Sequence, residues 1–500
     1  MANEWATFGS DLHLELRGPR LRAGLMEALR EAVRSGRLEA GTRLPSSRTL
    51  AADLGMARNT VADAYAELVA EGWLTARQGS GTRVAKRAAP RRTPAPAPGP
   101  ASRATRAPAP APGPASRTAP PSVVRRTTPP PAGRRPGGPA HDLKAGTPDL
   151  AAFPRAEWLK AYRRALTAAP NEAFGYGDPR GRIELRTALA EYLSRARGVH
   201  ARPERIMICS GFVHGLMLMS EVLRARGVRD VAVESYGLDI HADLLDRAGL
   251  GIPPLPHDER GTRVEELTEE GFGAAGAVLM TAAHQFPLGG ALPPDRRAAV
   301  VDWARASGGF VLEDDYDGEF RYDRQPVGAL QGLDPDRVVY LGTASKSLAP
   351  GLRLAWMVVP EELMAEVTAA KGAVDWVSSA PDQLAFAEFL GSGAYDRHVR
   401  ASRLRYRRRR DQLVAAVAAH SPETRVSGIA AGLHAVLALP PGTEQEVVRA
   451  AAWHGLAVQG VNQFRRPAVP PTLDGLVVGY ATPSDSGWQG ALRALCRVLP

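Results

Sequence analysis

The sequence predicts an α/β protein preceded by a small helical domain, and two observations lead to this prediction. From about residue 142 to the end, short apolar runs rich in β-branched residues alternate with longer helix-like segments, as in a mostly parallel sheet. Residues 13–84 instead contain three helix-like segments followed by two short strands. The chain has 500 residues, which is enough for two or more domains.

Composition narrows the class of protein. The two cysteines, Cys209 and Cys496, cannot build a disulfide framework, so we expect a reducing compartment, the cytoplasm. The first residues lack the basic start and apolar core of a signal peptide, and no run of about 18 apolar residues predicts a membrane span. The net charge is +10, but ten arginines and one lysine, with no acid, lie between Lys86 and Ala140. The rest of the chain is therefore nearly neutral.

The N-terminal domain is expected to begin with an amphipathic helix. Leucine or valine recurs every fourth residue from Leu21 to Val33, which predicts a helix over residues 19–35. Ser46 is a suitable N-cap for a short second helix. A third helix is predicted over residues 58–71, where apolar residues recur at helical spacing before a glycine.

Two short strands, at residues 73–77 and 81–84, enclose a glycine-rich turn. Three helices followed by such a hairpin predict a winged helix-turn-helix, whose third helix enters the major groove of DNA. We expect contacts to bases or phosphates from the start of the third helix, from the second helix and its approach, and from the hairpin: Arg58, Asn59, Thr60; Arg43, Ser46, Arg48; Arg77, Gly81, Arg83. The alternative is a structural three-helix module with solvated arginines.

Residues 85–140 are dominated by proline, alanine, arginine and glycine. The hexapeptide Pro-Gly-Pro-Ala-Ser-Arg at residues 98–103 recurs at residues 112–117. A segment with so little apolar surface to bury is predicted to be a disordered linker, which proline stiffens into a semi-rigid tether. Its arginines either add non-specific phosphate contacts or only aid solubility.

In the second domain, polar or glycine-rich sequences follow the apolar runs. Strands are predicted at residues 205–208, 231–234, 278–281, 309–312 and 337–341. Ligands bind at the carboxyl ends of parallel strands, so the residues after these runs are candidates for a site. Gly211 follows the first of these strands and leads into an apolar helix, an arrangement that can bind an anion.

Lys346 lies one turn past the last of these strands, close to Thr343 and Ser345. A partly desolvated lysine has a depressed pKa and can form a Schiff base with an aldehyde. Arg353 can add a fixed charge for an anion. Asp314 follows another predicted buried strand. Burial of its carboxylate there costs free energy unless a cation lies next to it. The alternative for Lys346 is an ordinary surface lysine after a strand.

These motifs resemble those of the MocR/GabR/PdxR-type subfamily of GntR transcription regulators. The motifs that carry the resemblance, in chain order, are Arg-Leu-Pro-Ser-Ser-Arg, Arg-Asn-Thr-Val, Gly-Ser-Gly-Thr-Arg-Val, His284-Gln285-Phe286-Pro287, Glu313-Asp314-Asp315-Tyr316, Phe320-Arg321-Tyr322, Gly342-Thr343 and Ser345-Lys346. The resemblance implies a winged helix-turn-helix at 13–84, a linker at 85–140, and a pyridoxal phosphate (PLP) aminotransferase-like domain at 141–500. That domain would have fold type I, with a small C-terminal α+β subdomain.

The resemblance also implies roles for single residues. Lys346 would hold PLP as an internal aldimine, Asp314 would meet the pyridine nitrogen, and Tyr316 would donate to the phenolic oxygen with His284 and Gln285. The phosphate would be held by Gly211, Phe212, Val213, Thr343, Ser345 and Arg353. The family often has an aromatic residue that stacks on the pyridine ring, and in the most direct register this sequence has Leu238 there. Either Tyr236, two residues earlier, takes its place, or aliphatic packing replaces stacking. No metal is expected.

One departure bears on the effector. Aminotransferases carry an arginine near the predicted strand 476–480 that binds the substrate carboxylate, and this strand has none; Arg465 and Arg466 lie outside the motif. This favours PLP itself as the signal. An arginine-rich stretch at residues 397–410 is predicted to be a solvated helix face rather than a DNA contact.

The predicted function is that of a cytoplasmic, homodimeric transcription regulator. It would bind an operator in double-stranded DNA, sense PLP or an amino compound at Lys346, and control vitamin B6 or amino-acid metabolism. The alternatives are an active aminotransferase with an attached DNA-binding domain, and a fold that has lost its cofactor.

Overall fold

The structure is a computed structural model, and it describes residues 21–34, 38, 41–54, 56–77, 81–85, 139–322 and 327–500. The predicted linker lies almost entirely outside the described residues, as do residues 1–20. None of the described helices combines the length and the apolar character that a membrane crossing requires.

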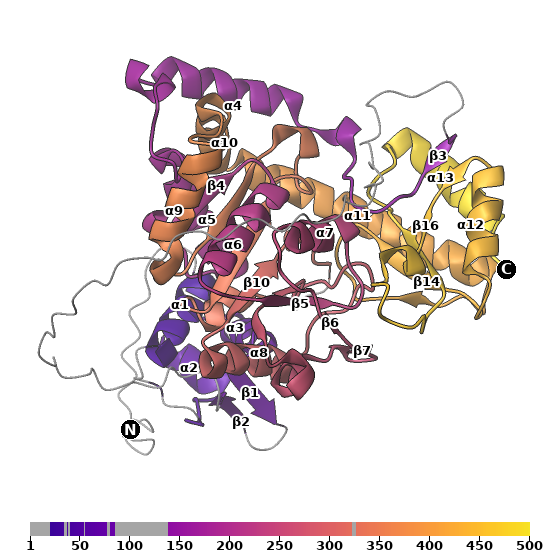
Figure 1. The fold of residues 1–500 in the computed structure, drawn as a ribbon, viewed down its shortest axis with the longest axis horizontal. Coiled ribbons are helices and arrows are strands. Elements are labelled where there is room, and N and C mark those ends of the chain that lie inside the picture. Colours follow the sequence, from indigo (N-terminus) through magenta and orange to yellow (C-terminus); the bar gives the residue numbers. More distant parts are fainter. Residues whose placement is uncertain are drawn as a thin grey trace, which may run out of the picture. The chain divides into compact units, whose positions relative to one another are not determined.

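The N-terminal domain contains the predicted three helices and hairpin (Figure 1, indigo): α1 (Leu21–Arg34), α2 (Ser47–Asp53), α3 (Arg58–Ala70), β1 (Leu74–Arg77) and β2 (Gly81–Val84). The two strands pair antiparallel. Leu25, Val61 and Leu68 are fully buried between the helices, as their spacing predicts. The Ser46 hydroxyl accepts a hydrogen bond from the Thr49 backbone at 3.1 Å, which confirms Ser46 as the N-cap.

The second domain is organised around a seven-stranded sheet. Its strand order is β4-β12-β11-β10-β9-β5-β6, and only β12 runs antiparallel to its neighbours. The bounds are β4 (Ile206–Cys209), β5 (Asp230–Glu234), β6 (Pro254–Leu255), β9 (Ala275–Met280), β10 (Phe310–Asp314), β11 (Val338–Thr343) and β12 (Ala355–Val358). The predicted, mostly parallel sheet is confirmed.

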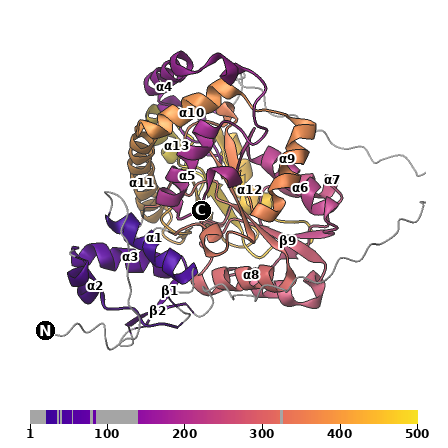
Figure 2. The same cartoon turned by 90° about the vertical axis from the view of Figure 1, so that its left-hand side faces the viewer.

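Helices cover both faces of this sheet, which is why its strands read as continuous apolar runs. On β11, Val338 and Tyr340 point into the packing with one set of helices, and Val339 and Leu341 into the packing with the other. The first set is α5 (Ile183–Arg197), α8 (Pro294–Ser307) and α10 (Ala380–Gly391). The second set is α6 (Phe212–Ala225) and α9 (Glu361–Val374), which Figure 2 shows side by side.

The C-terminal part forms a smaller α+β subdomain, drawn in orange to yellow in Figure 1. Its antiparallel sheet has the order β13-β14-β17-β16. The elements are α11 (Ala394–His420), β13 (Val426–Ser427), β14 (Ala435–Ala438), α12 (Glu444–Trp453), β15 (Leu456–Ala457), β16 (Gln459–Gly460), β17 (Gly475–Val478) and α13 (Asp485–Cys496). The remaining helices and strands are β3 (His141–Asp142), α4 (Arg155–Ala168), α7 (Asp239–Arg247), β7 (His257–Asp258) and β8 (Gly261–Thr262).

The strand β3 belongs to the C-terminal subdomain, although it comes first in the second domain. It pairs parallel with β15, in the register His141 to Leu456. In Figure 1, β3 accordingly lies beside α13. The chain therefore enters the second domain through its C-terminal subdomain and not through the large sheet.

The arginine-rich helix α11 only partly matches the expected solvated face. Arg397, Arg400, Arg407 and Arg408 are exposed. Arg409, however, is 1% exposed and pairs with Asp149 at 3.0 Å. The prediction was wrong for Arg409, because the partner carboxylate comes from a segment 260 residues away in the sequence.

Candidate functional site

A cavity of about 330 Å³ lies at the carboxyl ends of β5, β9, β10 and β11. This is the edge of a parallel sheet where ligands bind. The residues predicted from the sequence that line the cavity are Phe212, Val213, Tyr236, Asp314, Tyr316, Thr343, Ser345, Lys346 and Arg353. The fold therefore brings together side chains that are spread over about 140 residues of sequence.

One end of the site is a cradle for an anion. Gly211 has φ 100° and leads into α6 with no side-chain cap on the first backbone N–H groups. Arg353 has φ 52°, the left-handed region, and its Nη2 donates to the Ser210 carbonyl at 2.6 Å. A helix N-terminus that faces a guanidinium binds a phosphate group well.

The cradle depends on the absence of a side chain at Gly211, because a Cβ there would lie 2.1 Å from Arg353 Nη2. We expect Gly211→Ala to displace Arg353 and to destabilise the protein by about 1–3 kcal/mol. Gly351→Ala is the control, since a Cβ at Gly351 meets no atom within 4 Å and its φ is not positive. Thermal unfolding measures the loss of stability, and retention of a phosphate-bearing ligand measures the damage to the cradle. If both variants had the same melting temperature and retained the ligand equally well, the cradle would be refuted.

Lys346 occupies the middle of the site. Its Nζ donates to the Gly146 carbonyl at 2.6 Å. Burial lowers the pKa of Lys346, although the nearby Asp314 opposes this shift. The amine is therefore shifted toward its neutral, nucleophilic form. Sequence reasoning missed Gly146, whose contact with Lys346 spans 200 residues.

Of the carboxylates at positions 313, 314, 315 and 317, Asp314 lines the cavity. Burial raises its pKa well above the usual value, and its Oδ1 has no hydrogen-bond partner. Asp315 instead forms a bidentate pair with Arg197 at 2.7 and 2.8 Å, as expected of a structural ion pair. Glu313 accepts from the backbone of Leu330 at 2.6 Å. A buried acceptor without a donor indicates that a ligand supplies an N–H group there.

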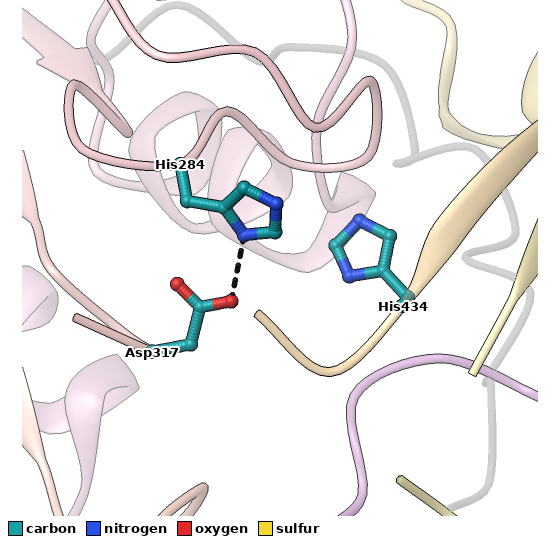
Figure 3. A group of neighbouring side chains, drawn as sticks. All are labelled: His284, Asp317 and His434. Atoms are coloured by element: carbon teal, nitrogen blue, oxygen red, sulfur yellow. Dashed lines mark hydrogen bonds and ion pairs between the residues drawn. The ribbon is translucent and has the colours of Figure 1, made fainter. Parts of the chain in front are cut away.

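Tyr316 lines the cavity, and its hydroxyl contacts His284 of a buried cluster. The cluster consists of His284, Asp317 and His434 (Figure 3). His284 Nδ1 lies 3.0 Å from the Tyr316 hydroxyl and 2.7 Å from Asp317 Oδ2. His434 Nε2 donates to the Pro287 carbonyl at 2.9 Å, and burial lowers the pKa of His434 to about 4. These bonds engage His284 Nδ1, Asp317 Oδ2 and His434 Nε2. The cluster therefore orients Tyr316, whose own pKa burial raises, so that the phenol remains a donor.

The structure places His284 and Gln285 away from the cavity lining. The Gln285 amide donates to the carbonyls of Tyr236 at 3.1 Å and Phe286 at 2.8 Å, and its Oε1 accepts from the Leu288 backbone at 3.0 Å. Gln285 thus holds its own loop together. The side chain of this motif that lines the cavity is Phe286.

Tyr236 and Leu238 both line the cavity, and so does a residue that the sequence did not single out, His241. The His241 ring lies 4.6 Å from the ring of Phe212, and burial lowers the pKa of His241 to about 3. It is therefore a neutral aromatic ring on the wall of the site. Arg466 also lines the cavity, although it lies outside the strand motif in which aminotransferases have their carboxylate-binding arginine.

Most of the residues predicted to contact DNA lie on the surface of the N-terminal domain. Arg43, Ser46, Arg48, Arg58, Asn59, Gly81 and Arg83 are exposed, and Thr60 is half-buried; the side chain of Arg77 is outside the part of the chain that the structure describes. Arg83 donates to the Gly41 carbonyl at 3.0 Å. Ala57 provides no side-chain cap for α3, and the Thr60 N–H donates to the Ala57 carbonyl at 3.0 Å.

Comparison with known proteins supports this two-part organisation. Residues 21–84 match the family described as bacterial regulatory proteins, gntR family, and residues 141–473 match aminotransferase class I and II. The chain is 31% identical over 440 residues to the pyridoxine biosynthesis transcriptional regulator PdxR of Corynebacterium glutamicum, covering 88% of each chain. It is 31% identical over 466 residues to the probable rhizopine catabolism regulatory protein MocR of Rhizobium meliloti, covering 91% of this chain and 89% of that one.

Among solved structures, an archaeal alanine:glyoxylate aminotransferase matches with a TM-score of 0.64 and 24% identity, over 72% of this chain and 90% of that one. The α-aminoadipate aminotransferase LysN of Thermus thermophilus matches with a TM-score of 0.63 and 25% identity, over 72% of this chain and 91% of that one. The regulators thus match nearly the whole chain, which favours a regulator over an aminotransferase with an added head. The chain belongs to the MocR/GabR/PdxR-type GntR transcription regulators, in which a DNA-binding winged helix is joined to an aminotransferase-like domain.

Proposed function

We propose that this regulator uses its second domain as a sensor that holds PLP at Lys346, and that the occupancy of this site sets its affinity for operator DNA. The observation that carries the proposal is the buried Asp314 Oδ1, which lacks a donor and belongs to the wall of the cavity that contains Lys346. PLP has a ring nitrogen that can bring the missing N–H group. The proposal further includes a homodimer that acts in the cytoplasm.

The residues of the site fit PLP at three points. The Gly211 turn and Arg353 form a cradle for its phosphate, Asp314 supplies an acceptor for its ring nitrogen, and Lys346 supplies a buried amine. When bound, PLP supplies an aldehyde that condenses with an amine and a ring that withdraws electrons.

Each of these side chains and backbone groups would then hold a different part of PLP. Arg353 and the first N–H groups of α6 hold the anionic end, and Asp314 keeps a proton at the ring nitrogen. Tyr316, fixed by His284, donates a hydrogen bond toward the phenolic oxygen. Gly146 holds Lys346 Nζ through its carbonyl. None of these roles requires turnover, so the site can serve as a sensor.

A ligand changes DNA affinity only if it binds the two DNA-affinity states unequally. The direct test is an electrophoretic shift assay with the DNA upstream of the protein's own gene, with and without PLP, at fixed salt. We expect the apparent dissociation constant to change when PLP is added. An identical constant in both conditions, in a protein shown to carry PLP, would refute the sensor role.

The DNA side has its own test. Arg58 and Asn59 lie exposed at the start of α3. Because good base contacts are worth about 1–3 kcal/mol each, the double variant Arg58→Ala/Asn59→Ala should bind the operator about tenfold or more weakly. Arg400→Ala is the control, because it removes an exposed arginine from α11 with a similar loss of charge. If both variants bound the operator equally well, the DNA contact would have to lie elsewhere on the protein.

A further inference from the structure

The residue that follows Lys346 is held from outside the cavity by the long helix α11. Ser347 is 2% exposed, and it contacts α11 through both its side chain and its backbone carbonyl. The Tyr395 oxygen lies 2.8 Å from Ser347 Oγ, and His398 Nε2 donates to the Ser347 carbonyl at 2.8 Å. Because consecutive Cα atoms are a fixed distance apart, these two contacts also restrain the backbone of Lys346.

Tyr395 has one proton for two neighbouring oxygen atoms. Its hydroxyl lies 3.1 Å from Glu319 Oε1 and 2.8 Å from Ser347 Oγ. An ionised Glu319 takes this proton, and the Ser347 hydroxyl then donates to the Tyr395 oxygen. When Glu319 is protonated, Tyr395 donates to Ser347 instead. Burial raises the pKa of Glu319 to about 7, so both forms exist near neutral pH, and Ser347 is held in each of them.

His398 holds the backbone of the same serine. Its Nε2 must carry the ring proton, because the partner atom is the carbonyl oxygen of Ser347. Burial lowers the pKa of His398, so the imidazole is neutral at pH 7 and above. The bond therefore restrains the peptide of Ser347 without placing a further positive charge close to Lys346.

The helix α11 also holds the segment that receives the lysine amine. Tyr406 and Arg409 lie on the buried side of α11, about three turns beyond the contacts to the serine. Arg409 Nη2 donates to Asp149 at 3.0 Å, and the Asp149 N–H donates to the Tyr406 hydroxyl at 3.1 Å. Asp149 comes shortly after Gly146, whose carbonyl accepts the hydrogen bond from Lys346 Nζ. One helix thus restrains both the backbone beside the lysine and the segment that binds its amine.

We propose that Tyr395 and His398 are positioning residues for Lys346, which hold its neighbour Ser347 so that the lysine amine stays inside the cavity. Where it concerns PLP, this inference rests on the proposed function, whereas the state of the amine can be measured without a cofactor. The proposal gives α11 a part in ligand binding although its residues are not in the cavity lining. The competing role for both side chains is purely structural, in the packing between α5 and α11.

Two measurements on the full-length protein test the proposal. In PLP-free protein, competitive acetylation with acetic anhydride at a series of pH values, followed by mass spectrometry, gives the pH midpoint of the reaction at Lys346. Burial lowers the pKa of Lys346, so we expect its midpoint to lie below that of the exposed Lys144 in the same sample. The second measurement is the dissociation constant for PLP, from the visible absorbance of the lysine-bound form.

We expect Tyr395→Phe to raise the midpoint of Lys346 toward that of Lys144, because a less restrained amine reaches more water. PLP binding should weaken roughly 2- to 10-fold, as for the loss of one hydrogen bond. Tyr192→Phe is the matched control, since the Tyr192 hydroxyl donates to the same Glu319 oxygen at 3.3 Å and its ring packs against Tyr395 with centroids 5.1 Å apart. The control should leave both readouts at their wild-type values.

Ser347→Ala removes the same hydrogen bond from its other side. Ser347→Ala and the double variant Tyr395→Phe/Ser347→Ala should weaken PLP binding to the same extent as Tyr395→Phe alone, because effects that act through one bond are not additive. At the second contact, His398→Leu should raise the midpoint and weaken PLP binding in the same direction. His398→Gln, which keeps an N–H donor, should restore most of the affinity.

The comparison of variants decides between the two roles. Equal changes in Tyr395→Phe and Tyr192→Phe, or fully additive effects in the double variant, would overturn the positioning role. A wild-type midpoint of Lys346 equal to that of Lys144 would do so as well. If Tyr395→Phe does not fold, wild-type values of both readouts in Ser347→Ala and His398→Leu would overturn it. A wild type that never forms lysine-bound PLP would refute the proposed function, while the midpoints in PLP-free protein would still decide the positioning role.

Discussion

Replacing Lys346 with alanine is expected to abolish covalent attachment of PLP while leaving DNA binding intact. In the wild type, borohydride reduction should fix the mass of the cofactor on the peptide that contains residue 346. The variant lacks the buried amine that donates to Gly146, so no reducible bond forms and PLP should be lost on dialysis. The measurements are mass spectrometry of the reduced protein and the visible absorbance band.

Lys144→Ala is the matched control, because Lys144 is an exposed lysine close in sequence to the Gly146 carbonyl. It should retain the band and the labelled peptide. In the DNA shift assay, Lys346→Ala should bind the operator as the PLP-free wild type does and should not respond to added PLP. A labelled peptide in Lys346→Ala, or label found at Lys371 in the wild type, would show that Lys346 has been misassigned.

Asp314→Asn is expected to have opposite effects on cofactor affinity and on the stability of the cofactor-free protein. The variant cannot hold a charge opposite the ring nitrogen, so PLP affinity should fall roughly 10- to 100-fold, as for a lost bond to a charged group. Without PLP, the same change removes a buried carboxylate that has an unpartnered Oδ1. The PLP-free variant should therefore be more stable than the wild type by about 1–3 kcal/mol at pH 8.

The sign of the pH dependence follows from the raised pKa of Asp314. The folded state holds this proton to a higher pH than the unfolded state does, so the wild type loses stability as the pH rises above the unfolded pKa of about 4. The stability difference between Asp314→Asn and wild type should thus grow from pH 5 to pH 8. Chemical denaturation of PLP-free protein at several pH values measures it.

Asp315→Asn provides the contrast for Asp314→Asn, because Asp315 forms the buried pair with Arg197. Removal of one partner of such a pair should destabilise the protein by about 3–5 kcal/mol. If Asp314→Asn behaved like Asp315→Asn, with lower stability and no specific loss of PLP affinity, Asp314 would be a structural residue and the ring-nitrogen assignment would fail.

Much of the fold could be predicted from local patterns. The strands of the large sheet are buried on both faces, so they appear in the sequence as apolar runs; Asp314 ends one of them, and Lys346 lies shortly after another. The glycine turn at Gly211 is likewise a local signal, since only a residue without Cβ fits beside Arg353. Backbone requirements of this kind are visible in the sequence.

Features that depend on distant segments were not predictable in the same way. Arg466 enters the site through backbone bonds to Ser235, and Arg409 is buried because Asp149 reaches it from the other end of the domain. The motif that contains Gln285 identified an important loop but not the direction of its side chains. Gln285 turns back onto its own loop, and Phe286 is the side chain that lines the cavity. No periodicity in the sequence encodes these choices.

The pairing of β3 with β15 has a mechanical consequence. The backbone that comes from the DNA-binding head is hydrogen-bonded first to the C-terminal subdomain, through His141 N and the Gly455 carbonyl at 3.0 Å. The same subdomain carries Arg466, which lines the cavity. One subdomain therefore both forms part of the cavity wall and holds the chain at residue 141, so a change in its position would also shift the point from which the preceding chain starts.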